Sequence, residues 1–397
     1  MFTLKLYDTP LLTFTVDYDA LRGELAPRIH WVTEQTELLP CILQREHCDP
    51  RALMYWLNTR RPPRNREYAS ELYKQAGLAE DDLNGFLTVT KGLSVEDAYW
   101  TPGIHDATRF DDVNLFDHNM SGILSLVAYT GRSEYPSGTV SGLSREWSTG
   151  GTFPKAWRRV EGKLKLYKSY AFQEQVNTVY AEFYASQILD ALGYSHVPYT
   201  LHKWKGKLAA VSDLFTSKEV AYAPYAEVHR EMHLYAVLSA MLKAGEPLQV
   251  VEQARRMYIA DILMQNLDRH TNNFGYLREN STGRLVGFAP LFDHNLSLYT
   301  ATLDKPTKDT TGEDLLNRRS VKNFPMRARI LVEALLTPDD HRALRRALNL
   351  RLEPSKSYPG SAEYRRVAET ATRKLAAAML RVPANRPSDV YQRLLEY

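Results

Sequence analysis

The order of the predicted elements constrains the fold of this 397-residue chain more than any other feature of its sequence. Strand-like residues dominate residues 141–215, interrupted by a helical pattern over residues 175–192, and the remainder of the chain is mostly helical in its periodicity. Strands and helices do not alternate regularly. The sequence therefore predicts an α+β fold with segregated lobes instead of a doubly wound sheet.

The N-terminal region mixes short strands and helices. Alternating apolar residues predict a hairpin within residues 2–16. Helical spacing of apolar residues within residues 49–84 predicts two helices, because Pro62 and Pro63 in the middle cannot lie inside a helix. Residues 91–148 are rich in Gly, Ser, Asp and Asn, and we expect a subdomain boundary between residues 130 and 145.

Composition indicates a folded globular protein, with 44% hydrophobic and 24% charged residues. The net charge of +3 is too small to indicate a nucleic-acid or membrane partner. Cys41 and Cys48 cannot build a disulfide framework, and their spacing does not suggest a zinc site. The first residues lack a signal-peptide pattern, and no apolar run approaches the roughly 18 residues of a membrane helix. We expect a cytoplasmic protein.

A predicted hairpin over residues 155–168 follows the glycine pair Gly150 and Gly151. Side chains alternate between the faces of a strand, so Lys168 shares a face with Leu164 and Leu166. Such a lysine either extends to water or meets an anion, and the glycine pair would let backbone N–H groups approach phosphates closely. A solvated basic hairpin is the alternative interpretation of this segment.

Glu182 borders the apolar face of the helix predicted over residues 175–192. It could form an ion pair with Lys168. Helical glutamates mostly face solvent, and Glu174 is a competing candidate for this role.

The most informative segment is residues 255–293, in which a helix is followed by a polar turn and two apolar runs. If the apolar runs pair across a turn at residues 279–284, the hairpin is centred on residue 283. Asn273 and Asp293 would then lie side by side. Their oxygen atoms suit Mg²⁺, which usually takes one or two protein carboxylates together with substrate phosphates.

Asp268 precedes Asn273 by five residues, which is the spacing of a phosphoryl-transfer catalytic loop. Asp and Asn also cluster in turns for local hydrogen-bonding reasons, so the pattern has a purely structural interpretation. A hydrolytic metal site built from Asp268, His270, Asp293 and His294 is a further alternative, although it would leave Asn273 without a role.

These motifs resemble the HipA-like serine/threonine kinases, a bacterial branch of the protein-kinase-like fold often found as toxins of toxin-antitoxin pairs. The resemblance covers residues 148–298. It implies that Asp268 is the catalytic residue, that His270 contacts the nucleotide and that Asn273 binds metal. The Ala-Pro-Leu-Phe-Asp segment ending at Asp293 supplies the second metal ligand in this resemblance.

The same resemblance extends to the strand-rich region. It implies a glycine-rich phosphate loop over residues 149–155 that ends in Lys155, with Lys168 as the ATP-binding lysine. It also implies a hinge over residues 211–215, which places Asp213 and Phe215 beside the nucleotide. The Gly-x-Gly-x-x-Gly, His-Arg-Asp, Asp-Phe-Gly and Ala-Pro-Glu motifs of eukaryotic kinases are missing, so the resemblance does not imply regulation through an activation loop.

Together these observations predict a bilobal kinase-like fold with an N-terminal α/β extension (residues 1–140), a β-rich N-lobe (141–216) and a helical C-lobe (217–397). The predicted function is ATP- and Mg²⁺-dependent phosphoryl transfer to a serine or threonine hydroxyl of a protein. The alternative is a catalytically weak pseudokinase or a nucleotide-dependent interaction module. A protein substrate and a cognate antitoxin are the expected partners, without direct nucleic-acid or membrane binding.

Overall fold

The computed structural model describes the chain except residues 20–22, 134, 139–140, 301–304 and 319–326. It consists of two compact units. Unit 1 contains Met1–Ala171, Asp213–Ala223 and Tyr276–Gly287, and unit 2 contains Phe172–Ser212, Pro224–Gly275 and Phe288–Tyr397. The predicted boundary at residue 140 falls within the first segment of unit 1, and residue 140 itself lies outside the described residues. The division into extension, N-lobe and C-lobe stays a prediction.

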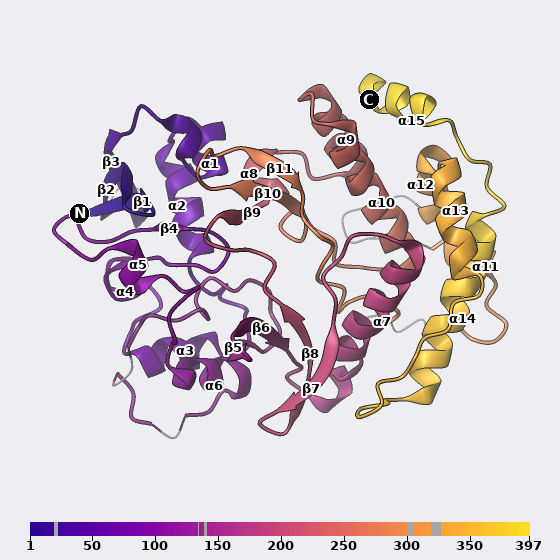
Figure 1. Cartoon of the computed structure of the whole chain (residues 1–397), viewed down its shortest axis with the longest axis horizontal. Coiled ribbons are helices and arrows are strands. Elements are labelled where there is room, and N and C mark those ends of the chain that lie inside the picture. The colour runs from indigo at the N-terminus through magenta and orange to yellow at the C-terminus, as the bar shows by residue number, and fades with distance from the viewer. Residues whose placement is uncertain (20–22, 134, 139–140, 301–304, 319–326) are drawn as a thin grey trace. The chain divides into compact units, whose positions relative to one another are not determined.

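Unit 1 begins with a four-stranded sheet in the order β3-β2-β1-β4 (Figure 1). Its strands are β1 (Phe2–Leu6), β2 (Thr9–Asp19), β3 (Glu24–Val32) and β4 (Tyr99–Trp100). The predicted N-terminal hairpin is confirmed, since β1 and β2 pair antiparallel with Phe2 opposite Phe14 and Leu4 opposite Leu12. These apolar pairs place one face of the sheet in the core.

The helical elements of unit 1 are short. They are η1 (Thr36–Leu38), α1 (Cys41–Arg45), α2 (Pro50–Thr59), α3 (Ala69–Ala76), α4 (Leu83–Thr90), α5 (Phe110–Val113) and α6 (Gly122–Thr130). Asp49 caps α2 by accepting a hydrogen bond from Arg51 N–H at 2.7 Å, and Pro50 occupies the first turn, where its missing N–H costs nothing. The predicted pair of helices separated by the prolines is confirmed as α2 and α3.

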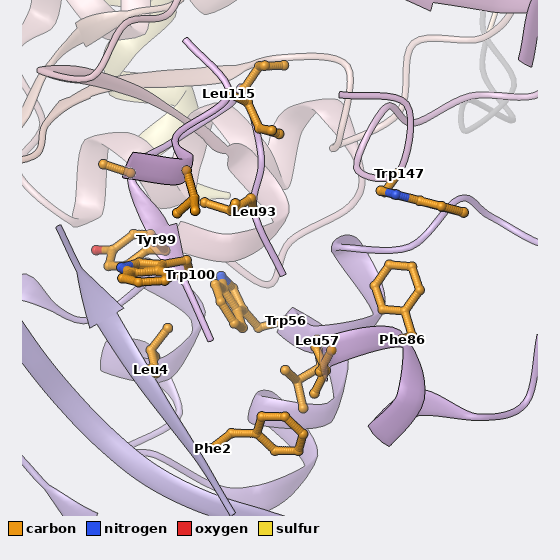
Figure 2. Packing of buried hydrophobic residues seen from close by; sticks show 14 of the residues in the cluster. Phe2, Leu4, Trp56, Leu57, Phe86, Leu93, Tyr99, Trp100, Leu115 and Trp147 are labelled. Atoms are coloured by element: carbon orange, nitrogen blue, oxygen red, sulfur yellow. The ribbon is translucent and has the colours of Figure 1, made fainter. Parts of the chain in front are cut away.

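An aromatic core joins the sheet to the segment that precedes the glycine pair (Figure 2). Trp56 packs edge-on against Tyr99 with ring centroids 6.1 Å apart, and Phe86 packs edge-on against Trp147 at 5.4 Å. The Trp147 indole N–H donates to the carbonyl of Gly142 at 2.7 Å. This packing anchors the chain directly before residue 148.

The remaining strands of unit 1 include the predicted hairpin of β5 (Lys155–Val160) and β6 (Lys163–Lys168). Its two turn residues, Glu161 and Gly162, have φ values of 51° and 78°, as a tight two-residue hairpin turn requires. A second sheet, in the order β11-β10-β9, lies mostly in unit 1. Its strands are β9 (Val220–Pro224), β10 (Gly275–Glu279) and β11 (Leu285–Phe288). The sequence did not predict β9.

Unit 2 is mostly helical. Its helical elements are η2 (Gln173–Gln175), α7 (Asn177–Leu192), α8 (Tyr225–Val228), α9 (Leu234–Lys243), α10 (Leu248–Met264), α11 (Gly312–Leu316), α12 (Ala328–Leu335), α13 (Pro338–Ala347), α14 (Ala362–Met379) and α15 (Pro387–Glu396). It also holds a hairpin of β7 (Thr200–Trp204) and β8 (Lys207–Asp213), apart from Asp213, which belongs to unit 1. Helix α10 packs against α9, α12 and α14 (Figure 1). Among the described residues, none of the helices is both long and apolar enough to cross a membrane.

Candidate active site

Two buried lysines lie opposite each other in unit 1. Lys155 and Lys168 are direct partners in the β5–β6 ladder, and they are only 4% and 8% exposed. The Lys155 ammonium group donates a hydrogen bond to the carbonyl of Gly150. Like charges directly opposite on a sheet repel each other, so this arrangement favours an anion nearby. Lys163, on the other face, has a side chain that is 72% exposed, as the alternation predicted.

The glycine pair has different requirements at its two positions. Gly151 has φ +83°, and a Cβ atom there would lie 2.5 Å from Lys155 Nζ, so a side chain at this position would be strained and crowded. A Cβ atom at Gly150 would have no heavy atom within 4 Å. The loop is therefore tight at Gly151 and open at Gly150, which suits close approach of a ligand to the backbone.

The predicted hinge residues Asp213 and Phe215 also lie in unit 1. The Asp213 carboxylate pairs with Lys165, and Asp213 lines a cavity of about 450 Å³. The Phe215 ring contacts Tyr222 edge-on with centroids 5.7 Å apart. Their role in holding adenine stays a prediction.

The predicted catalytic loop lies in unit 2 and follows α10, which ends at Gln265 in a left-handed conformation (φ 50°). Two hydrogen bonds from Asn273 close the loop. Its backbone N–H donates to the carbonyl of His270 at 2.8 Å, and its side-chain Nδ2 donates to the carbonyl of Asp268 at 3.2 Å. Because Nδ2 is directed at the loop, the amide oxygen on the other side of the planar group is directed away from Asp268.

A buried arginine connects this loop to the segment that contains Asp293. Arg269, whose side chain is 0% exposed, pairs with Asp261 of α10 at 2.9 Å. Its Nη1 donates to the carbonyls of Asn273 at 2.7 Å and Phe292 at 2.8 Å, and its Nη2 lies 3.0 Å from His294 Nε2. One guanidinium group thus holds Asn273 close to the residue before Asp293. The predicted proximity of the two segments agrees with this geometry.

Asp293 has an unusual backbone conformation and a buried acid beside it. Its φ is 61°, in the left-handed region that few residues other than Gly and Asn adopt. The next residue, His294, donates its backbone N–H to Glu182 Oε2 at 2.9 Å, and Glu182 is 1% exposed. Glu182 therefore helps to hold the Asp293 segment in unit 2. Its predicted ion pair with Lys168 stays a prediction, and Glu174 is exposed.

The geometry disfavours the hydrolytic metal site considered from the sequence. His294 Nε2 lies 3.0 Å from a guanidinium nitrogen of Arg269, so this nitrogen already faces a cation. Among the described residues, no three His, Cys, Asp or Glu side chains cluster in a way that could hold a metal ion. A site with Asn273 and Asp293 as its two protein ligands is compatible with this, because Mg²⁺ bound with a nucleotide takes its other ligands from phosphates and water.

The predicted register of the β10–β11 hairpin is wrong by about two residues. Glu279 N–H donates to Arg284 O and Ala289 N–H donates to Gly275 O, both at 2.9 Å, so the hairpin is centred near residue 282 instead of 283. The turn itself lies where it was predicted, between Glu279 and Leu285, and Gly283 within it adopts φ +72° and donates its N–H to Glu279 O.

Two residues of this network, Asp261 and Arg269, were not among the candidates that the sequence indicated. A signal was present, because Asp261 is an acid within the apolar run that ends α10, and a buried acid needs a partner. The partner, however, could not be chosen from the sequence, since several arginines lie near Asp261 along the chain.

Comparisons with known proteins place the chain near bacterial kinases in sequence and in fold. No family model matches the sequence. A serine/threonine-protein kinase, CtkA of Helicobacter pylori, is 25% identical over 162 residues, which cover 38% of this chain and 49% of that protein. The match thus spans about half the length of this curated relative.

Solved structures give a likeness in fold. HipA of Shewanella oneidensis, solved in a complex with HipB and operator DNA, covers 100% of both chains with a TM-score of 0.55 and 12% identity. The crystal structure of CtkA of Helicobacter pylori covers 62% of this chain and 93% of its own, with a TM-score of 0.42 and 19% identity. The chain is therefore kinase-like in sequence, resembles the HipA-like kinases and has the mixed helix-and-sheet fold of HipA.

Proposed function

We propose that this chain is a serine/threonine-protein kinase that transfers the γ-phosphoryl group of ATP, in the presence of Mg²⁺, to a hydroxyl group of a protein. The observation that carries the proposal is the Arg269 network. It connects the loop of Asp268 and Asn273 to the segment of Asp293 through buried hydrogen bonds. Phosphoryl transfer depends mostly on positioning and electrostatics, so rigid placement of these groups is what the chemistry requires.

Each residue has a separate role in this proposal. Asp268 orients the acceptor hydroxyl and accepts its proton. Asn273 and Asp293 hold Mg²⁺, which neutralises the charge that develops on the phosphates. Lys155 and Lys168 attract the phosphates of ATP electrostatically, and the buried position of both ammonium groups strengthens that attraction.

Two isosteric substitutions separate binding from chemistry. Asp268→Asn should leave the Mg²⁺-dependent stabilisation by ATP intact while phosphoryl transfer falls by roughly 10²-fold to 10⁴-fold, the usual contribution of a positioned general base. Asp293→Asn should reduce both, and Asn tolerates the left-handed backbone there. Asp190→Asn is the control, since this unit 2 carboxylate is 74% exposed.

Thermal shift with ATP, with and without Mg²⁺, and a transfer assay on a generic protein acceptor give the two readouts. Parental transfer by Asp268→Asn, or full Mg²⁺ dependence in Asp293→Asn, would contradict the roles assigned here. If the parental chain binds ATP and Mg²⁺ but transfers no phosphate to any protein in a labelled-ATP lysate assay, the pseudokinase or interaction-module alternative replaces the kinase.

We also propose a cognate antitoxin as a partner of this chain. The proposal is supported by the fold likeness to a HipA chain that was solved with HipB. Co-expression with the product of the neighbouring gene, followed by co-purification, tests it. Separate elution of the two proteins would contradict it.

A further inference from the structure

A short segment between α2 and α3 is bonded along the length of the glycine loop. Arg66 and Glu67, which follow the Pro62–Pro63 break, donate hydrogen bonds to four backbone carbonyls of unit 1. These carbonyls recur at every third residue and belong to Glu146, Thr149, Thr152 and Lys155. The loop is thus held before, within and after the glycine pair by one two-residue segment.

Arg66 makes three of these four contacts. Its Nη1 donates to the carbonyls of Glu146 and Thr149, the latter at 3.3 Å, and its Nη2 donates to the carbonyl of Lys155 at 3.3 Å. The Glu67 backbone N–H donates to the carbonyl of Thr152 at 2.8 Å. Only a guanidinium group has the several diverging donors that this arrangement needs, and a lysine ammonium group could not reach all three carbonyls.

These bonds orient the amide groups of the loop. In a trans peptide unit, the N–H points opposite to the C=O of the preceding residue. Because the Thr149 carbonyl faces Arg66, the N–H of Gly150 faces away from it, and the Thr152 carbonyl directs the N–H of Phe153 in the same manner. Phosphate-binding loops depend on backbone N–H groups presented in this way.

The Arg66 charge is compensated at a cost. The Arg66 side chain is 1% exposed, and its Nη2 lies 3.7 Å from Glu146 Oε2. The Glu146 side chain is fully buried. Burial lowers the pKa of Arg66 more than the Glu146 charge raises it, and burial raises the pKa of Glu146 more than Arg66 lowers it. A buried ion pair of this kind adds little net stability, so the carbonyl contacts of Arg66 are its main structural contribution.

We propose that Arg66 is a positioning residue that holds the loop of residues 149–155 in the conformation that presents its N–H groups to the phosphates of the nucleotide. This inference rests on the proposed function, because that function supplies the nucleotide as the ligand. It extends the proposed function by assigning part of the phosphate site to the N-terminal region. Arg66 does not itself touch the nucleotide in this proposal.

Arg66→Lys tests the proposal, because it keeps the positive charge next to Glu146 and removes the fork of donors. The matched control is Arg60→Lys. Arg60 is 4% exposed, also lies in unit 1 and pairs with Asp97 through bonds of 2.9 and 2.6 Å that do not involve the loop. Hydrogen exchange of peptides covering residues 145–157 is measured without nucleotide, and steady-state kinetics are measured with ATP and Mg²⁺.

Arg66→Lys should accelerate exchange in these peptides by at least about tenfold and raise KM for ATP by at least about tenfold, with kcat within about threefold of the parent. Arg60→Lys should leave loop exchange and KM close to parental values. Unchanged loop exchange in Arg66→Lys, or equal effects of both substitutions, would overturn the proposal. If the parental chain does not bind ATP, the proposed function fails, and the exchange comparison alone decides whether Arg66 holds the loop.

Discussion

Replacing Arg269 by Met should destabilise unit 2 more than any surface substitution. The side chain of Arg269 is 0% exposed, and that of its partner Asp261 is 1% exposed. Methionine fills a similar volume but leaves the Asp261 carboxylate buried with one remaining side-chain donor, Asn266 Nδ2 at 2.8 Å. The carbonyls of Asn273 and Phe292 lose a shared donor in the same step.

The expected cost follows from these losses. Breaking a buried ion pair by removing one partner typically costs about 3–5 kcal/mol, because the remaining charge is uncompensated. The two orphaned carbonyls act in the same direction, although water entering the loop would offset part of their loss. Since a folded domain is stable by only about 5–15 kcal/mol, this is a large fraction of the stability of unit 2.

Hydrogen exchange of α10 peptides, measured over a series of urea concentrations, reports the loss of stability in the helix that carries Asp261. This measurement does not assume that the whole chain unfolds in one step. A loss of about 3–5 kcal/mol corresponds to exchange that is faster by at least on the order of 10²-fold. Arg329→Met is the control, because its ion pairs with Glu313 and Glu333 are surface pairs and should contribute little.

The double variant Asp261→Asn/Arg269→Met completes the test. Once the buried carboxylate is neutralised, part of the lost stability should return, so the double variant should be more stable than Arg269→Met alone. A loss below about 1 kcal/mol in Arg269→Met, the size of one ordinary hydrogen bond, would refute the reasoning. So would a double variant that is less stable than the single one.

Two further predictions concern the glycine loop and the lysines near it. In calorimetry, Lys168→Ala should weaken ATP binding by about tenfold or more. Lys163→Ala should change ATP binding little, because the Lys163 side chain is 72% exposed, and the reverse order of effects would invalidate the strand-face argument. Incubation with ATP and Mg²⁺ should add phosphate to the loop. Thr152 should be modified first because it is exposed, whereas Ser148 and Thr149 are only 5% and 7% exposed. An unmodified loop in the mass spectrum of an active enzyme would reject this prediction.

Local patterns predicted the parts of the molecule that depend on neighbouring residues. Strand periodicity predicted the β5–β6 hairpin and the face on which Lys168 lies, because side-chain alternation is a property of any strand. The spacing of five residues between Asp268 and Asn273 is also explained by contacts within the loop. Asn273 closes the loop by donating hydrogen bonds to the carbonyls of His270 and Asp268.

Features that depend on an exact register or on a distant partner did not follow from local patterns. The β10–β11 register was wrong by about two residues, because the pairing depends on the backbone conformation within the turn, where Gly283 is left-handed. The structure also gives Glu182 a partner that no local pattern indicated, the backbone N–H of His294, 112 residues away in sequence. Neither outcome can be calculated from hydrophobic periodicity.

The sequence alone therefore determined the N-terminal and β5–β6 hairpins, the two helices around the prolines and the residue types available for phosphoryl transfer, since each follows from contacts between near neighbours. The tertiary structure alone decided that Arg269 holds the Asn273 and Asp293 segments together and that Arg66 holds the glycine loop. The physical reason is that a buried guanidinium group must satisfy its donors and its charge wherever the fold supplies acceptors. For Arg66 those acceptors are 80 to 89 residues away along the chain, beyond the reach of any local pattern.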